Sequence, residues 1–88
     1  MNTFKVQFIS PDDQFVFNDV LSILVNGRDG EFMILADHAP YLIYALPGII
    51  TIKTLNKIEQ KIVISSGILK VINNFCEIIV NEVHMFNS

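Results

Sequence analysis

Apolar residues alternate with polar ones along most of this 88-residue chain, and no other feature restricts its fold as strongly. Phe4, Val6 and Phe8 alternate with polar neighbours near the N-terminus, and Ile50 and Ile52 do so in the middle of the chain. A spacing of two places every second side chain on the same face of an extended strand. We find no segment of about ten or more residues with the 3.6-residue spacing of an amphipathic helix. The sequence therefore predicts an all-β fold.

Turn-forming residues interrupt this alternation at regular intervals. They occur at Ser10-Pro11-Asp12-Asp13, Asn26-Gly27-Arg28-Asp29-Gly30, Pro47-Gly48, Ser65-Ser66-Gly67 and Asn73-Asn74. A turn roughly every 8–12 residues is typical of a β-sandwich or barrel. We therefore predict one domain over residues 1–88, a flattened β-sandwich of about eight to ten short, mostly antiparallel strands.

The boundaries of some strands follow from the same pattern. Residues 15–17 and 21–25 are predicted as two separate short strands, and residues 31–35 as another. Residues 55–57 are predicted as the tip of a hairpin. Residues 82–88 show no clear pattern, so we expect no regular element there.

The apolar content is high for so short a chain. Hydrophobic residues make up 51% and charged residues 17% of it, and the mean hydropathy is +0.46. A disordered chain lacks the apolar groups to bury, so this balance excludes disorder. A small domain cannot bury all of this apolar surface, which indicates that a partner covers part of it.

The aromatic residues of the strands are expected in the core. The phenylalanines in question are Phe4, Phe8, Phe15, Phe17, Phe32 and Phe75. Alternating aromatics in strands pack inside a sandwich far more often than they form a stacking surface for bases or sugars. For Tyr41 and Tyr44 the sequence leaves two alternatives open, exposed contact residues or half-buried residues at a sheet edge.

The charge of the chain argues against a nucleic-acid partner. Nine acidic residues outnumber six scattered Lys and Arg residues, giving a net charge of −3. A nucleic-acid binder needs a basic stripe to displace counterions from phosphates, and a polybasic membrane tether needs a similar cluster. The longest apolar run, residues 41–52, is about half the length of a membrane-spanning helix and contains Pro47-Gly48.

The sequence offers no set of residues that suggests catalysis or metal binding. Its only histidines are His38 and His84, and the serines of Ser65-Ser66-Gly67 lack the preceding glycine of a nucleophile elbow. One cysteine and two distant histidines do not match a zinc site. Cys76 lies in an apolar strand without a cationic neighbour, so we expect a buried, unreactive thiol in a reducing compartment. We expect no catalytic residue, cofactor or metal.

Several short motifs stand out along the chain: Gly30-Glu31-Phe32-Met33-Ile34-Leu35, His38-Ala39-Pro40, Leu46-Pro47-Gly48 and Ser66-Gly67-Ile68-Leu69-Lys70-Val71. Their order and spacing resemble those of the epsilon subunit of F-type ATP synthases, from about residue 3 to residue 80. The sequence departs from the family pattern at Ala36-Asp37, where a proline and then a small residue are usual. It departs again at Ser66, which replaces the first glycine of a Gly-Gly pair.

The resemblance implies a non-catalytic rotor subunit of the central stalk. Such a subunit links the gamma subunit to the c-ring and supports the coupling of ion translocation to ATP synthesis. The stretch from Gly30 to Pro40 is then expected to face the ring as one loop. Glu31 would oppose polar or basic ring groups, His38 would lie near the junction with gamma, and Ser10 would lie at the same end. The implied contact residues are Ser10, Gly30, Glu31, Phe32, His38, Ala39 and Pro40.

The resemblance also implies a location. A bacterial protein would lie at the cytoplasmic face of the inner membrane, held there only through the complex, and a chloroplast protein on the stromal side of the thylakoid. The family normally continues into a C-terminal helical hairpin that often inhibits ATP hydrolysis. Since this sequence stops at Ser88, we expect coupling without inhibition. The alternative to the resemblance is a stand-alone β-sandwich that binds some other protein.

Overall fold

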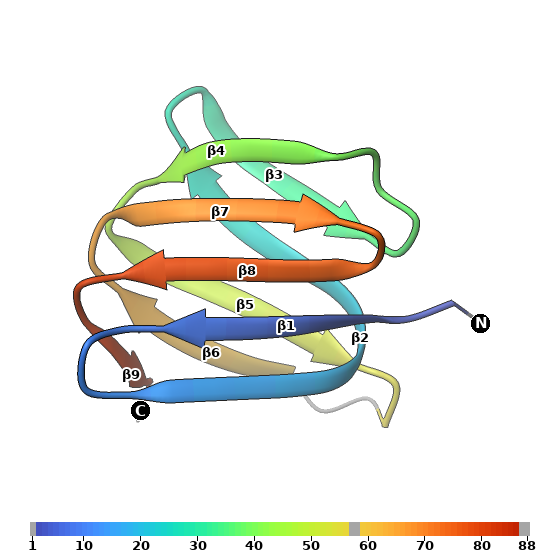
Figure 1. The fold of residues 1–88 in the computed structure, drawn as a ribbon, viewed down its shortest axis with the longest axis horizontal. Coiled ribbons are helices and arrows are strands. Elements are labelled where there is room, and N and C mark those ends of the chain that lie inside the picture. The colour runs from blue at the N-terminus through green and yellow to red at the C-terminus, as the bar shows by residue number, and fades with distance from the viewer. Residues whose placement is uncertain (1, 57–58, 87–88) are drawn as a thin grey trace.

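The computed structural model describes residues 2–56 and 59–86, which form nine β-strands, mostly antiparallel, and no helix (Figure 1). The strands are β1 (Phe4–Ile9), β2 (Gln14–Gly27), β3 (Gly30–Leu35), β4 (Tyr41–Ala45), β5 (Gly48–Thr54), β6 (Glu59–Ile64), β7 (Gly67–Ile72), β8 (Phe75–Val80) and β9 (Val83–Met85). In this part of the chain there is accordingly no helix of the length and apolarity that crossing a membrane requires. The all-β prediction is confirmed.

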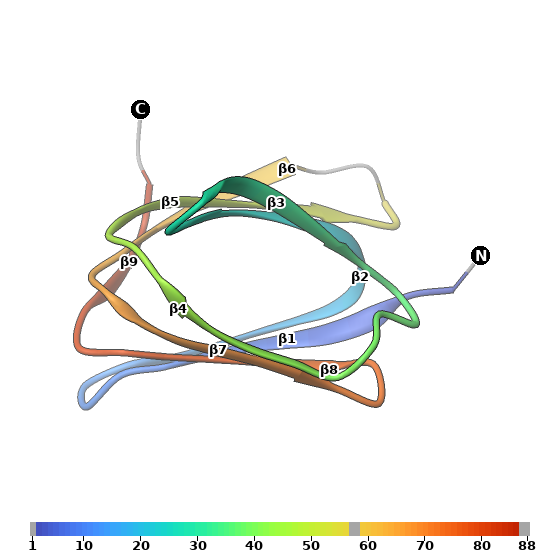
Figure 2. The ribbon, with the colours of Figure 1, turned by 90° about the horizontal axis from the view of Figure 1, so that it is seen from above.

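The strands form two layers that share one strand (Figure 2). The first layer has the order β4-β7-β8-β1-β2, and the second has the order β3-β2-β5-β6-β9. Neighbouring strands are antiparallel except β1 and β8, which run parallel. The 14-residue β2 pairs with β1 through its first half and with β3 and β5 through its second half. It therefore joins the layers along one side of the sandwich.

The continuity of β2 corrects the prediction of two separate strands at residues 15–17 and 21–25. The polar residues Asn18 and Asp19 between them suggested a break, but the chain only bends there. Asp19 takes a positive φ of 55°, and the registers of β2 with β1 and with β5 both shift at this point. Such a bulge bends a strand without ending its ladder.

The C-terminal prediction needs a second correction. Val83–Met85 forms β9, which pairs with Ile62–Ile64 of β6, although residues 82–88 were expected to hold no element. Three residues are too few to show an alternation, and only Val83 is buried. The predicted hairpin tip at residues 55–57 extends into residues 57–58, which lie outside the described residues, as do residues 87–88.

The inward side chains of both layers form one core. It contains Phe4, Val6, Phe8, Val20, Ile23, Val25, Ile34, Ala45, Ile50, Ile52, Ile62, Ile64, Leu69, Val71, Cys76, Ile78, Val80 and Val83. Phe8 is fully buried and meets Phe17 edge-to-face, with ring centroids 5.9 Å apart. Phe15, Phe17 and Phe32 pack against this core, and Phe75 is half-buried. The core prediction is thus confirmed for Phe4 and Phe8, whereas the other four phenylalanines are only partly buried.

Candidate docking site

The motif-rich stretch from Gly30 to Pro40 is not one loop. Gly30–Leu35 is the edge strand β3, and only residues 36–40 form a connection to β4. At a rise of about 3.3 Å per residue, β3 separates Gly30 from Leu35 by about 17 Å. The expectation of a single loop is therefore wrong, and its residues are divided between the two ends of the sandwich, whereas contact with the ring stays a prediction.

Ser10, Gly30 and Glu31 lie at one end, which we call the Gly30 end. Gly30 pairs with Gly27 at the tip of the β2–β3 hairpin. The end of β2 is linked to the end of β4 by a hydrogen bond from the Leu46 N–H to the Asn26 carbonyl, at 3.2 Å. Ile9, the last residue of β1, pairs with Ile79 near the end of β8, and β8 ends beside the end of β4 through β7. The turn that begins at Ser10 is therefore at this end too. Ser10 closes that turn, because its N–H donates to the Asp13 carbonyl at 2.9 Å.

His38, Ala39 and Pro40 lie at the opposite end, which we call the Asn74 end. Asp37 is held there by three hydrogen bonds. Its N–H donates to Asn74 Oδ1 at 2.6 Å, and its carboxylate accepts from Asn74 Nδ2 at 2.9 Å and from Asn2 Nδ2 at 2.7 Å. The hydrogen bonds from Asn74 and then from Asn2 lower the pKa of the Asp37 carboxyl. The connection is thus fastened to the β7–β8 turn and to the N-terminal segment.

Phe32 lies between the two ends, on the inner side of β3. Its ring meets that of Tyr41 edge-to-face at 5.9 Å, and the Tyr41 ring is 5.5 Å from the ring of His38. Phe32 also covers Gly27, where a Cβ would meet the Phe32 ring at 2.8 Å, so a larger residue there would push the ring aside. Tyr41 and Tyr44 are both exposed, which decides between the two alternatives left open for them.

The structure brings together an apolar row that sequence reasoning missed. Tyr44, Ile68, Ile79 and Ile9 stand directly opposite one another on β4, β7, β8 and β1. They point away from the core; Tyr44 is 76% and Ile79 46% exposed. The signal was present in the sequence, because Ile68 and Ile79 occupy positions where the alternation requires a polar residue. We call these four residues the exposed row.

The outer face of the second layer is different. Met33 and Leu35 of β3 are each 54% exposed, but Ser22, Thr51 and the lysines at 53 and 61 follow across β2, β5 and β6. A shallow groove of about 510 Å³ lies over β2 and β3, with Met33, Leu35, Lys53 and Asp37 among its lining residues. Apolar residues on this face are therefore interrupted by polar and basic ones.

The described residues offer surfaces rather than reacting groups. Within residues 2–56 and 59–86, no three His, Cys, Asp or Glu side chains lie together in a way that could hold a metal ion. Burial, and secondarily the charge of Glu77, raises the pKa of the Cys76 thiol to about 12. Cys76 is fully buried, as predicted. The fold and the exposed row define an all-β domain with an apolar line on one outer face.

Comparisons with known proteins place this domain in a family. Residues 3–85 match the family described as the ATP synthase, Delta/Epsilon chain, beta-sandwich domain. The ATP synthase epsilon chain of Wolbachia pipientis wMel is 60% identical over 87 residues, which cover 99% of this chain and 76% of that relative. The chain therefore belongs to the ATP synthase delta/epsilon chain family. Membership makes it a non-catalytic subunit and excludes the alternative of an unrelated β-sandwich module.

Two solved structures share the fold at low sequence identity. One is the central stalk/c-ring of the mitochondrial ATP synthase of Tetrahymena thermophila, with a TM-score of 0.80 and 18% identity. The match covers 94% of this chain and 66% of that one. The other is the OSCP/F1/c-ring assembly of the Euglena gracilis mitochondrial ATP synthase, with a TM-score of 0.87 and 21% identity, covering 94% of this chain and 53% of that one.

Proposed function

We propose that this chain, a central-stalk subunit of the ATP synthase, links a gamma subunit to the c-ring and so supports the coupling of ion translocation to ATP synthesis. The observation that carries the proposal is the exposed row, an unbroken apolar line on a sheet of a protein that belongs to the ATP synthase delta/epsilon family. A solved structure with the same fold is described as part of a central stalk and c-ring. Large exposed apolar areas on small proteins mark docking surfaces.

The gamma subunit is assigned to the outer face of the β4-β7-β8-β1 sheet. The exposed row crosses four strands, or about 14 Å at a strand spacing of about 4.8 Å. Leu42 and Val16 widen the apolar area beside the row, since both lie on the outer face and are exposed. A preformed sheet loses little conformational freedom on binding, which favours a stable one-to-one contact.

The c-ring is assigned to the Gly30 end. Ser10, Gly30 and Glu31 lie at this end, and Gly30 and Glu31 are exposed at the tip of a tight hairpin. Glu31 gives this end a negative charge that can oppose polar or basic groups of the ring. His38, Ala39 and Pro40 lie at the Asn74 end, so we assign them to gamma rather than to the ring.

The location follows from the assembly. We place the chain at the cytoplasmic face of a bacterial inner membrane, attached only through the complex. The curated relatives that support this location are bacterial, Wolbachia pipientis and Mesorhizobium japonicum among them.

Binding of the tagged chain to purified gamma and to a purified gamma–c-ring assembly tests this function. We expect one-to-one capture by gamma and tighter capture by the assembly. Glu31→Lys should remove most of the gain that the ring provides, about tenfold in affinity, because a rim charge is reversed. Glu59→Lys is the control, since Glu59 is an exposed acid at the other end of its layer.

The outcomes separate the parts of the proposal. His38→Ala should weaken binding to purified gamma. It should leave unchanged the additional affinity that the ring provides. Equal ring-dependent gains for wild type, Glu31→Lys and Glu59→Lys would overturn the assignment of the Gly30 end to the ring. Failure of both gamma and the assembly to capture the folded wild-type chain would overturn the proposed function.

A further inference from the structure

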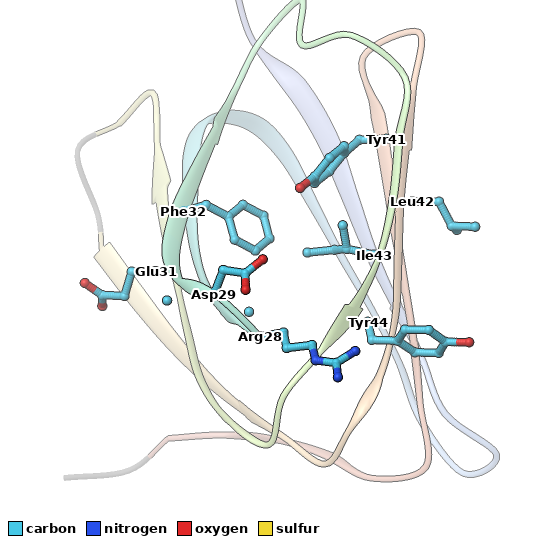
Figure 3. Close-up of a pocket in the computed structure, with 10 residues that line it drawn as sticks. Arg28, Asp29, Glu31, Phe32, Tyr41, Leu42, Ile43 and Tyr44 are labelled. Carbon is cyan, nitrogen blue, oxygen red and sulfur yellow. The ribbon is translucent and has the colours of Figure 1, made fainter.

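The two layers have free edges that face each other across an open groove (Figure 3). Among the described strands, β3 pairs only with β2, and β4 pairs only with β7. The groove between them has a volume of about 380 Å³, with residues 27–32 on one wall and residues 41–44 on the other. In Figure 3 Phe32, Tyr41 and Ile43 point into this space, whereas Leu42 and Tyr44 point away from it. The latter two line the groove through their main chain.

Leu46 shows which main-chain groups of β4 point into the groove. Its N–H donates to the Asn26 carbonyl of β2, on the other layer, at 3.2 Å. Main-chain groups of alternate residues in a strand point to the same side, and β4 pairs with β7 without a register shift. The N–H and C=O groups of Leu42 and Tyr44 therefore point into the groove, and those of Ile43 point to β7. Among residues 2–56 and 59–86, no strand pairs with β4 on the groove side.

This edge lacks the features by which proteins usually prevent strand pairing. Edge strands are typically protected by charges, prolines, bulges or very short length. The five residues of β4, Tyr-Leu-Ile-Tyr-Ala, contain no charge and no proline, and the strand has no bulge. By contrast, β9 at another edge has only three residues and carries His84, whose ring lies 4.0 Å from the Glu82 carboxylate. An exposed, flat and uncharged edge strand is suited to accept a further strand.

We propose that an extended segment of the gamma subunit enters this groove and pairs with β4 as an additional strand of the β4-β7-β8-β1 sheet. The proposal rests on the docking function above, because the added strand continues the exposed row beyond Tyr44. The segment is about five residues long, to match β4. It is apolar on both sides, since one side lies against Phe32 and Ile43 and the other beside Leu42.

The charged side chains of the groove do not select the charge of the partner segment, because Arg28 lines it together with Asp29 and Glu31. The chemistry of the partner segment is therefore a short apolar strand.

Amide hydrogen exchange of the full chain, alone and bound to purified gamma, tests this inference. In the free chain the amides of Leu42 and Tyr44 should exchange fast, and that of Ile43, which is bonded to β7, slowly. In the complex the exchange of Leu42 and Tyr44 should slow at least tenfold. Binding that leaves these two amides fast would overturn the strand addition but keep the proposed function. Absence of binding would overturn both.

A pair of variants at one position separates the main chain from the side chain. Leu42→Pro and Leu42→Ala both remove the exposed leucine side chain, but only proline removes the N–H that points into the groove. We expect Leu42→Pro to bind gamma about tenfold more weakly than Leu42→Ala. The amide of Ile43 reports whether β4 still pairs with β7 in each variant. Equal affinities of two variants with a protected Ile43 would overturn the proposal.

Discussion

The two outer faces of the sandwich differ in how many large apolar residues they expose and in how these residues are aligned. On the β4-β7-β8-β1 face, the exposed row places apolar residues directly opposite one another on four neighbouring strands. On the other face, Met33 is followed by Leu24 and then by Thr51 and Lys61. Register adds to this difference in composition, because cross-strand alignment turns single apolar residues into a continuous surface.

The largest effect that should separate the two faces is on binding to gamma. Ile79→Glu places a charge in the middle of the exposed row and should weaken gamma binding about a hundredfold, the range of an interface hot spot. Met33→Glu is the matched control, since Met33 is at least as exposed but lies on the other face. It should change the affinity less than threefold by the same titration. A reversed order of the two variants would exchange the roles of the faces.

A comparison within β8 distinguishes docking from folding. Ile78 is fully buried and Ile79 is exposed, although they are neighbours with the same side chain. Ile78→Ala should lower the free energy of unfolding by about 3 kcal/mol, and Ile79→Ala by less than about 0.5 kcal/mol. Urea denaturation of the isolated chain measures both. A comparable loss in the two variants would mean that the exposed row stabilises the fold itself.

Gly67 allows β7 and β8 to approach closely beside the exposed row. A Cβ at this position would overlap the Ile79 carbonyl oxygen and the Val80 side chain. Gly67→Ala should therefore cost about 2 kcal/mol of unfolding free energy, because the main chain of β8 must move. Ser66→Ala, at the exposed neighbouring position, serves as the control in the same denaturation experiment. Equal stability of both variants would show that β8 adjusts freely.

The smallest expected effect concerns the rim of the groove on the other face. Asn74→Ala removes the main hydrogen-bond partner of Asp37, so the Asp37 pKa should rise toward its ordinary value of 3.8. A carboxyl whose pKa is lowered by folding stabilises the fold above its unfolded pKa, and this contribution disappears as the pH falls through the folded value. NMR titration of the Asp37 carboxyl in wild type and variant measures the shift. An unchanged pKa would mean that Asn2 alone holds the carboxylate.

Much of the fold was predictable because the inward side chains repeat with a spacing of two. The strand at Glu31–Leu35, the buried Cys76 and the packing role of Phe8 all follow from that spacing. The bend at Asp19 was not predictable, since a polar pair between two apolar runs is equally compatible with a turn. Only pairing with β1 and β5 shows that β2 continues through it.

The candidate site was harder to predict than the fold. The motifs fall partly on an edge strand, but proximity in sequence suggested one loop where the structure has two separate ends. The exposed row depends on the registers of three strand pairs, and a single strand carries no information about its register. Local signs exist at single positions such as Ile68 and Ile79, because they are apolar where the alternation requires polar residues.

The course of β2 through both layers also has a mechanical consequence. Its 14 residues connect the sheets by covalent bonds along one side, so a shear force on either sheet is transmitted to the other without breaking a hydrogen bond. The opposite side, where β3 and β4 face each other, has no such link along most of its length. Deformation under load should therefore be confined to that side, with the sheets opening about β2 rather than sliding past one another.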